Sequence, residues 1–281
     1  MAPVISHISV IVVTKNEEKR IARCLKPLST EFSDIRVVDS MSDDKTVRIA
    51  KGFGAQVTDF HWNGKYPKKY QWCLDHLDGL NDWVLFVDAD EIVTPPLIAE
   101  LEALTPVGAG YYVTSRYRVD GKILNYGMVN KKLCLLNRHK MIFPVVDDLD
   151  IKGGVGEIEG HYQPVKRPYF KGEPISKLQG EMIHEALDDP KAWAHKHEHY
   201  AQWEAEMDRR NAWPPDPSVW RNLLKRIFRA LPLRGVAAFI HSYIWKGGFM
   251  DGSAGYRLAR SRYLYYRRIA KIASETSKHL V

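Results

Sequence analysis

Two carboxylates, separated by one small residue, follow one of the most apolar stretches of the chain. Asp88, Ala89 and Asp90 come directly after the run WVLFV at positions 83–87. A buried strand would deliver both aspartates to one edge of a sheet, where hard oxygen ligands suit Mg²⁺ or Mn²⁺ that bridges to a diphosphate. Paired acids also occur in solvated turns, so the apolar strand before them is what favours a divalent metal site.

Polar side chains also follow the first two apolar runs of the chain. Apolar spacing predicts strands at 8–13, 35–38, 55–59 and 83–87, which alternate with helices at 16–28, 43–52 and 67–77. This alternation is typical of an α/β fold, with a mainly parallel sheet flanked by helices, and ligands then gather at the carboxyl ends of the strands. Besides the two aspartates, the polar residues expected at that edge are Thr14, Asn16, Glu17, Asp39 and Ser40.

Several classes of protein lose support because their motifs do not occur. No GxGxxG follows the first strand and no GxxxxGK[ST] occurs anywhere, which argues against dinucleotide binding and P-loop chemistry. The 3 cysteines are widely spaced and form no CxxC pair; a reducing cytosol therefore fits better than a disulfide framework or a structural zinc. Hydrophobic residues make up 45% of the chain, enough for a sizeable core, but no apolar run reaches the roughly 20 residues that span a bilayer.

Three spaced segments of the first hundred residues match a known family pattern. They are ISVIVVTKNEEKRIARCL at 8–25, VVDSMSDDKT at 37–46 and KKYQWCLDHLDGLNDWVLFVDADE at 68–91. They resemble the nucleotide-sugar-binding half of family 2 glycosyltransferases, which have the GT-A fold. Within that family the chain is most similar to bacterial lipopolysaccharide-core and cell-surface polysaccharide glucosyltransferases, and KGGFMDGSAG at 246–255 resembles them more loosely. The family's turn usually reads DSGSTDGT, whereas here Met41 replaces the first glycine.

The resemblance implies roles for individual residues. Glu17 and Asp39 would contact the nucleoside, with Asp39 accepting a hydrogen bond from the base; the alternative is that both only cap a helix and form a turn. Asp88 would contact ribose or metal, and Asp90 would hold the divalent cation. The other residues that the resemblance places on the donor side are Lys68 and Gln71.

Inverting glycosyl transfer also needs a carboxylate that takes the proton of the acceptor hydroxyl. Glu157 and Glu159 lie two residues apart in the Gly-rich segment GGVGEIEGHYQP at 153–164, so an extended chain would place them on one face. In the resembling enzymes an acid in this region is the base, and we favour Glu159, beside His161, over Glu157. The alternative is an edge hairpin with solvated acids, and the outside candidates for the base are Asp147 and Asp148.

A histidine further along the chain is a candidate for an additional metal ligand. His184, in QGEMIHE, resembles the later histidine that many GT-A enzymes contribute to the metal. A neutral imidazole together with carboxylates would suit manganese somewhat better than magnesium. The alternative is a packed side chain held by a hydrogen bond.

The basic residues are concentrated at the end of the chain. From Val219 onward there are 13 Lys or Arg against 2 acids, so the rest of the chain is net negative. Apolar residues at a spacing of three to four predict one amphipathic basic helix from Val219 to Leu231 and a second from Ala254 to Ala273. Such helices either lie in the headgroup plane of an anionic membrane or pack their apolar faces on the protein.

Together these features predict a metal-dependent inverting glycosyltransferase, a hexosyltransferase that uses Mn²⁺ or Mg²⁺. It would move a sugar from a nucleotide diphosphate donor, UDP in the first place, to a lipid-linked saccharide in cell-surface polysaccharide or lipopolysaccharide synthesis. The expected partners are the nucleotide sugar, the saccharide acceptor and an anionic membrane surface, with no nucleic acid. We expect a cytoplasmic protein, peripheral at the inner face of the cell membrane.

The predicted organisation is a GT-A domain with a C-terminal helical basic appendage. Residues 1–215 would form the glycosyltransferase domain, with a donor half at 1–100 and an acceptor half at 101–215, and residues 216–281 the basic tail. Two alternative functions are left open by the sequence. One is a nucleotidyltransferase that acts on sugar phosphates, and the other is a non-catalytic sugar-binding or membrane-binding protein of the same fold.

Overall fold

The chain forms two compact units in the computed structural model, which describes residues 4–151, 156–159, 162–185, 187, 190–214, 216 and 218–278. Unit 1 consists of Met1–Arg116, Asn130–Phe143 and Gln163–Glu185, and unit 2 of Tyr117–Val129, Pro144–Tyr162 and Ala186–Val281. The compact units divide the chain at other positions than the predicted boundary at residue 215. The predicted boundary separates a catalytic domain from a basic tail by their expected functions, and it stays a prediction.

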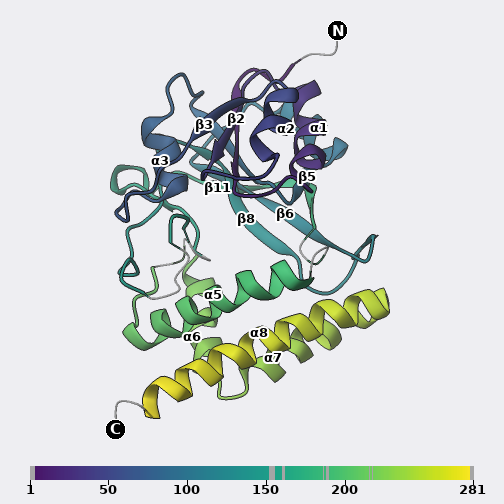
Figure 1. Ribbon diagram of the computed structural model, residues 1–281, viewed down its shortest axis with the longest axis vertical. Coiled ribbons are helices and arrows are strands. Elements are labelled where there is room, and N and C mark those ends of the chain that lie inside the picture. The colour runs from purple at the N-terminus through teal and green to yellow at the C-terminus, as the bar shows by residue number, and fades with distance from the viewer. Residues whose placement is uncertain are drawn as a thin grey trace. The chain divides into compact units, whose positions relative to one another are not determined.

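Unit 1 is built on a mixed β-sheet with the strand order β3-β2-β1-β4-β8-β6-β11-β5 (Figure 1). Parallel pairing joins the first four of these strands, which are β1 (Ile8–Thr14), β2 (Ile35–Asp39), β3 (Gln56–Asp59) and β4 (Trp83–Asp88). Antiparallel pairing joins β4 to β8 (Asn130–Asn137), β8 to β6 (Gly110–Val119), and β11 (Ile175–His184) to β5 (Glu91–Val93). The predicted α/β class is confirmed, with a parallel half and a half that contains antiparallel pairs.

The parallel strands are buried because their residues are apolar on both faces. Six of the seven residues of β1 and the first five of β4 are buried, and such strands need helices over them. The helices of unit 1 are α1 (Ile21–Glu31), α2 (Thr46–Gly52), α3 (Lys69–His76) and α4 (Pro95–Ala103). The short elements of unit 1 are β9 (Met141–Ile142), β10 (Val165–Lys166) and η1 (Pro168–Phe170). In unit 2, β7 (Lys122–Ile123) pairs with the end of β6.

The first helix begins five residues later than predicted. We expected a helix over 16–28, whereas α1 spans Ile21–Glu31 and Arg20 is its N-cap. Asn16 has a left-handed backbone, with φ 55°, so the segment before Arg20 is a loop. Its amides bond to the loop after β2 instead of starting a helical turn, and apolar spacing does not reveal such a long-range pairing.

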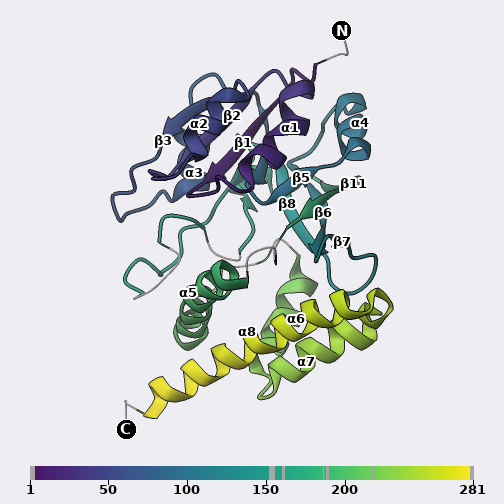
Figure 2. The ribbon, with the colours of Figure 1, turned by 45° about the vertical axis from the view of Figure 1, so that its right-hand side comes forward.

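Unit 2 consists mainly of helices packed along α8 (Ser253–Lys278). Both α5 (Pro190–Arg210) and α7 (Arg234–Ile240) lie against α8 (Figure 2). Tyr200 and Ala201 of α5 form a small core with Tyr265 and Ile269 of α8. Between α7 and α8 the chain makes a π-helical turn, η2 (His241–Trp245), and a 3₁₀ turn, η3 (Gly248–Asp251).

Both predicted basic helices are confirmed, as α6 (Val219–Ala230) and α8. Their apolar faces differ in environment. Tyr265 and Ile269 of α8 are buried, whereas α6 has no buried residue and its Trp220 is 75% exposed. Packing on the protein therefore accounts for the apolar face of α8 but not for that of α6. Among the described helices, none is long and apolar enough to cross a membrane.

Candidate functional site

The carboxyl ends of β1 and β2 are joined through Asp39. This buried carboxylate accepts a hydrogen bond from the hydroxyl of Thr14 at 2.7 Å. It also accepts from the backbone amide and the hydroxyl of Ser42, at 2.7 and 2.6 Å. The turn-forming role of Asp39 is thus visible in the structure, and its predicted contact with a nucleotide base would use the remaining lone pairs of the same carboxylate.

A second set of hydrogen bonds joins the loop after β1 to the loop after β2. The Oδ1 atom of the exposed Asn16 accepts from the amide of Asp43 at 3.0 Å. The amide of Glu17 donates to the hydroxyl of Thr46 at 2.7 Å, while the carboxylate of Glu17 accepts from Arg20 at 3.0 Å. Thr14, Asn16, Glu17 and Asp39 therefore lie together at one edge of the sheet, as predicted from strand order.

Met41, in the loop that follows β2, has an unfavourable backbone conformation. Its φ is 55° and its side chain is 55% exposed. A left-handed conformation costs a residue with a Cβ roughly 1–2 kcal/mol, a penalty that glycine avoids. The loop therefore keeps the shape that the family's glycine would allow, although methionine occupies the position.

Lys68 and Gln71, the other two predicted donor-side residues, are buried around α3. The Nζ of Lys68 lies 5.4 Å from the centroid of the Tyr66 ring. The side-chain amide of Gln71 donates to Asp75 at 2.8 Å and accepts from the backbone amide of Phe143 at 2.9 Å. Gln71 thus holds α3 against the segment that follows β9, which is a structural task, and its contact with a donor stays a prediction.

Glu91 is the buried centre of the acidic cluster. It is fully shielded from solvent and accepts from the ammonium of Lys132 at 2.8 Å, from the hydroxyl of Ser115 at 3.1 Å and from the amide of Asp88 at 3.2 Å. Lys132 also donates to the carboxylate of Asp88 at 2.6 Å. One ammonium on β8 therefore bridges two carboxylates delivered by β4 and β5.

The two aspartates of the DxD sequence have different neighbours. Asp88 accepts from the hydroxyl of Tyr70 at 2.6 Å as well as from Lys132. Asp90 faces His184, whose Nε2 lies 3.5 Å from Asp90 Oδ2. His184 reaches this position because antiparallel β11 pairs with β5, with His184 opposite Glu91 in the register.

The charges of this cluster stabilise one another. Burial raises the pKa of the Asp88 carboxyl. The Lys132 ammonium and the hydrogen bonds from Lys132 and Tyr70 lower this pKa by more, so it lies below its ordinary value. Burial lowers the pKa of Lys132, yet the carboxylates of Asp88 and Glu91 raise it well above its ordinary value. Burial lowers the pKa of His184, but the carboxylates of Asp90 and Glu91 raise it by more, so the pKa lies above its ordinary value. Asp88 is therefore ionised and Lys132 charged at neutral pH.

The donor atoms of this edge fit a divalent cation of the manganese type. Asp90 and His184 present a carboxylate oxygen and an imidazole nitrogen to each other, the mixed ligand set that suits Mn²⁺. Among the residues that the structure describes, however, no three His, Cys, Asp or Glu side chains are already arranged around a common metal position. Binding would therefore require at least one of these side chains to adjust.

Sequence reasoning missed the residues that balance the acidic cluster. Lys132 lies 44 residues from Asp88 and 41 from Glu91, so local spacing could not associate them. A second lysine, Lys69, lies outside the acidic cluster and was missed for the same reason. Its buried ammonium donates to the carbonyl of Thr14 at 3.2 Å, 55 residues away. The only signal in the sequence was a lysine at the start of an apolar run, in NKKLCLL at 130–136.

The two candidates for the catalytic base belong to unit 2. Glu159 is buried and Glu157 is half-buried, whereas His161, which we placed beside Glu159, lies outside the described residues. Asp148, an outside candidate, accepts from the indole of Trp203 at 2.9 Å and so has a packing role. The choice of base stays a prediction.

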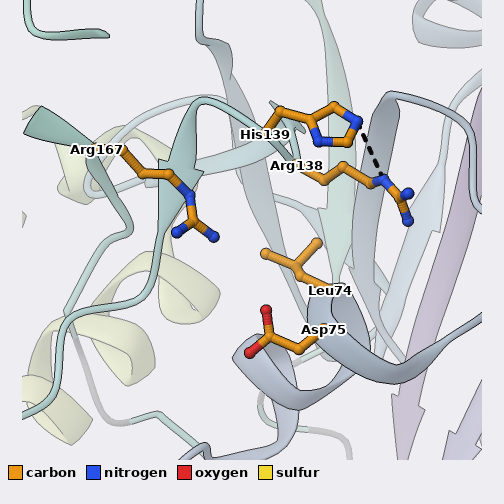
Figure 3. A pocket seen from close by; sticks show the side chains of 5 residues that line it. All are labelled: Leu74, Asp75, Arg138, His139 and Arg167. Atoms are coloured by element: carbon orange, nitrogen blue, oxygen red, sulfur yellow. Dashed lines mark hydrogen bonds between the residues drawn. The ribbon is translucent and has the colours of Figure 1, made fainter. Parts of the chain in front are cut away.

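An open hollow of about 350 Å³ in unit 1 lies away from this site (Figure 3). Arg167 and Asp75 extend toward one another across it. Arg138 also lines the hollow. Its backbone amide donates to the carbonyl of Asp82, which lies just before β4 begins, whereas Asp88 ends that strand. At about 3.3 Å per residue these two positions are about 20 Å apart along β4, so the hollow lies at the opposite edge of the sheet.

Comparison with known proteins identifies relatives of the first part of the chain. The model of a family described as glycosyl transferase family 2 matches residues 9–171. An uncharacterized glycosyltransferase of Rickettsia prowazekii is 36% identical over 138 residues, which cover 47% of this chain and 46% of that protein. A 4,4'-diaponeurosporenoate glycosyltransferase of Staphylococcus haemolyticus is 37% identical over 89 residues, or 30% of this chain and 24% of that protein. The chain thus matches less than half the length of these curated relatives.

A solved structure matches nearly the whole chain at low similarity. It is a mannosyltransferase of Pyrobaculum calidifontis in complex with GDP-Man and Mn²⁺. The sequence identity is 16% and the TM-score is 0.49, over 97% of this chain and 89% of the other.

Replacing Lys132 tests whether its charge holds the acidic cluster together. We expect Lys132→Met to lower the free energy of unfolding by about 2 kcal/mol or more, because the buried Glu91 carboxylate would lose its counter-charge. Urea denaturation at neutral pH measures the change. Lys131→Met, at the exposed neighbouring position of β8, is the control and should stay within about 0.5 kcal/mol of the parent. Equal stability of the two variants would contradict this role.

Replacing Met41 tests the strain in the paired loops. Met41→Gly should raise the free energy of unfolding by up to about 1 kcal/mol, because the left-handed penalty disappears and only part of it is offset by the flexibility of glycine in the unfolded chain. Asp43→Gly, at an exposed position of the same loop without a positive φ, should instead lower it. If thermal denaturation showed both variants equally destabilised, the methionine side chain would be contributing contacts that outweigh the strain.

Proposed function

The chain belongs to glycosyl transferase family 2, and on that premise we propose that it moves a sugar, with inversion, from a UDP-linked donor to a hydroxyl of a lipid-linked saccharide. The resemblance of its motifs to cell-surface polysaccharide and lipopolysaccharide-core enzymes supports this class of acceptor. The observation that carries the proposal is the cluster of Asp88, Asp90 and Glu91 just beyond the carboxyl end of β4, where α/β folds bind their ligands. Family membership also favours glycosyl transfer over nucleotidyl transfer.

In this proposal Asp90 and His184 hold the divalent cation, Mn²⁺ or Mg²⁺, and Asp88 contacts the cation or the ribose. When bound, such an ion stabilises the negative charge of a departing diphosphate. Lys132 acts as a positioning residue, because it fixes Asp88 against Glu91 through two short hydrogen bonds. A ligand whose geometry is fixed in advance loses less conformational entropy on binding.

The nucleoside is assigned to the paired loops after β1 and β2. Asp39 is held by Thr14 and Ser42, which fixes its carboxylate before a donor arrives. Asn16 and Glu17 lie at the same edge of the sheet, where their side chains have solvent access. Lys68 remains a candidate for the donor phosphates, since it is the N-cap residue of α3 and carries a basic group.

The acceptor hydroxyl must lose a proton as the new glycosidic bond forms. We assign this proton to the carboxylate of Glu159, with Glu157 as the second candidate, because one carboxylate is needed in addition to those that hold the cation. Glu159 is the more buried of the two. Exclusion of water around a general base limits the competing transfer of the sugar to water.

The exposed apolar face of α6 supports peripheral association with an anionic membrane at the cytoplasmic face. The large apolar side chains exposed on this helix are Val219, Trp220, Leu223, Leu224 and Ile227. Arg226 is exposed among them, while Lys225 bonds to Asp216 at 2.6 Å. A helix with this combination gains both from apolar burial at the headgroup boundary and from attraction to anionic lipid.

Loss of the Asp90 carboxylate is the direct test of the catalytic site. Asp90→Asn should lower turnover by on the order of 100-fold or more, because the charge that holds the cation is removed. The measurement is release of free nucleoside diphosphate from a panel of nucleotide sugars supplied with Mn²⁺ and a lipid-linked saccharide. Asp82→Asn, an exposed carboxylate before the amino end of β4, is the matched control and should keep full turnover. Unchanged turnover in Asp90→Asn would remove the metal role.

Cation binding gives a second readout that does not depend on turnover. We expect Asp90→Asn and His184→Gln each to weaken Mn²⁺ binding by on the order of tenfold or more in the presence of UDP, since each removes a donor atom. Isothermal titration calorimetry measures the affinity, with Asp82→Asn again as control. If only Asp90→Asn weakens Mn²⁺ binding, His184 is a packed side chain and not a metal ligand.

A further inference from the structure

A second group of exposed apolar side chains lies between α7 and α8. Its members, which we call the apolar knob, are Ile240, Ile244, Trp245, Phe249 and Met250. Trp245 is 82% exposed, more than any other tryptophan among the exposed large residues of the described chain. Exposed groups of this size on a soluble surface mark contact sites for partners or membranes.

The backbone under the apolar knob is tightly packed. A Cβ on Gly255 would lie 1.9 Å from the carbonyl oxygen of Gly248, and a Cβ on Gly248 would lie 2.6 Å from that of Ser242. Only glycine permits such close approach of backbone to backbone. Ser242 is itself buried and donates to the carbonyl of Ala238 at 2.7 Å. The knob is therefore presented on a fixed turn.

Asp251 fastens this turn to the hairpin loop that follows β7. Its buried carboxylate accepts from the amides of Asn125 and Tyr126, at 3.2 and 2.9 Å. Its backbone carbonyl accepts from the ammonium of Lys122 at 3.0 Å. These bonds account for the acid in the KGGFMDGSAG motif. The apolar side chains beside it stay largely exposed, although Phe249 meets the ring of Tyr243 edge-on at 6.4 Å.

The charge around the knob matches an anionic bilayer. From Val219 to the end of the chain there are 13 basic residues and 2 acids, and Asp251, one of these acids, is buried. Lys246 is exposed next to Trp245. Burial lowers the pKa of His241, and the nearby Lys246 and Arg262 lower it further. An exposed tryptophan with a neighbouring lysine is typical of segments that lie at a membrane interface.

We propose that the apolar knob is a second membrane contact, which inserts its side chains into an anionic bilayer at a point separate from α6. This inference rests on the membrane association in the proposed function and adds a fixed orientation to it. The knob directly precedes α8, whereas Phe228 of α6 packs on Tyr266 of α8 at a ring distance of 4.9 Å. From Ser253 to Tyr266 the helix rises about 20 Å. Two contacts separated by that length would hold unit 2 at one angle to the membrane.

Each contact should contribute separately to vesicle binding. Vesicles of phosphatidylcholine alone and of phosphatidylcholine with phosphatidylglycerol in equal parts are sedimented with the full chain. We expect the double variant Trp245→Ser/Phe249→Ser to bind both kinds of vesicle on the order of tenfold less, because two large apolar side chains no longer leave water. Leu224→Ser/Ile227→Ser, which removes apolar side chains of α6 and leaves its basic residues in place, should also reduce binding.

Matched controls separate insertion from general changes in the surface. Tyr169→Ser removes an aromatic side chain that is 96% exposed on unit 1 and should leave vesicle binding unchanged. Trp245→Phe should keep most of the binding and lose only the share of fluorescence quenched by brominated lipid that comes from Trp245, while Trp220 of α6 keeps its own share. Because the replaced side chains are exposed, the thermal unfolding midpoint should stay within a few degrees of the parent.

The outcomes distinguish this inference from the proposed function. If the parent chain binds no vesicles, the membrane part of the proposed function and the knob both fail. If the parent binds and the α6 variant loses binding while the knob variant equals Tyr169→Ser, membrane association stands and the knob is overturned. Knob-dependent self-association in analytical ultracentrifugation, without any knob-dependent vesicle binding, would assign the surface to a second copy and would also overturn it.

Discussion

Carboxylates that gather at one edge of a sheet need positive charge among them, and the strand order of unit 1 places an ammonium between Asp88 and Glu91. The parallel half ends in Asp88 and is followed at once by Asp90 and Glu91. The other half contributes Lys132 from β8 and His184 from β11. Because an uncompensated buried carboxylate costs several kcal/mol, the placement of β8 beside β4 and of β11 beside β5 is a condition for the acidic edge to exist at all.

This arrangement also determines how much negative charge the site keeps for a ligand. Lys132 is shared between Asp88 and Glu91, at 2.6 and 2.8 Å, so one positive charge offsets one of these two negative charges. Asp90 faces the imidazole of His184 at 3.5 Å, and the carboxylates of Asp90 and Glu91 raise the pKa of that imidazole. We propose Asp90 as a ligand of the cation, whereas Asp88 is held in a fixed orientation by Lys132.

The sequence predicted the features that depend on neighbouring residues and missed those that depend on distant ones. The strands, the α/β class and the gathering of Thr14, Asp39 and Asp88 at one edge follow from apolar runs and from the rule for parallel sheets. The start of α1 was placed too early, because the amides of Asn16 and Glu17 bond to Ser42 and Thr46, 26 and 29 residues away. Lys132 was missed for the same physical reason, since its partners are set by strand order.

The basic tail shows the same limit in another form. Spacing correctly predicted that α6 and α8 are amphipathic helices, but it contains no information on which surface an apolar face meets. Tyr265 and Ile269 of α8 pack on α5, while Phe228 of α6 meets the ring of Tyr266 on α8 edge-on. Each large side chain that stays in water forgoes about 1.5–3 kcal/mol of burial energy. A helix that leaves several of them exposed beside basic residues is therefore more stable against a surface that can bury them, and a bilayer with anionic headgroups provides both the apolar interior and the opposite charge.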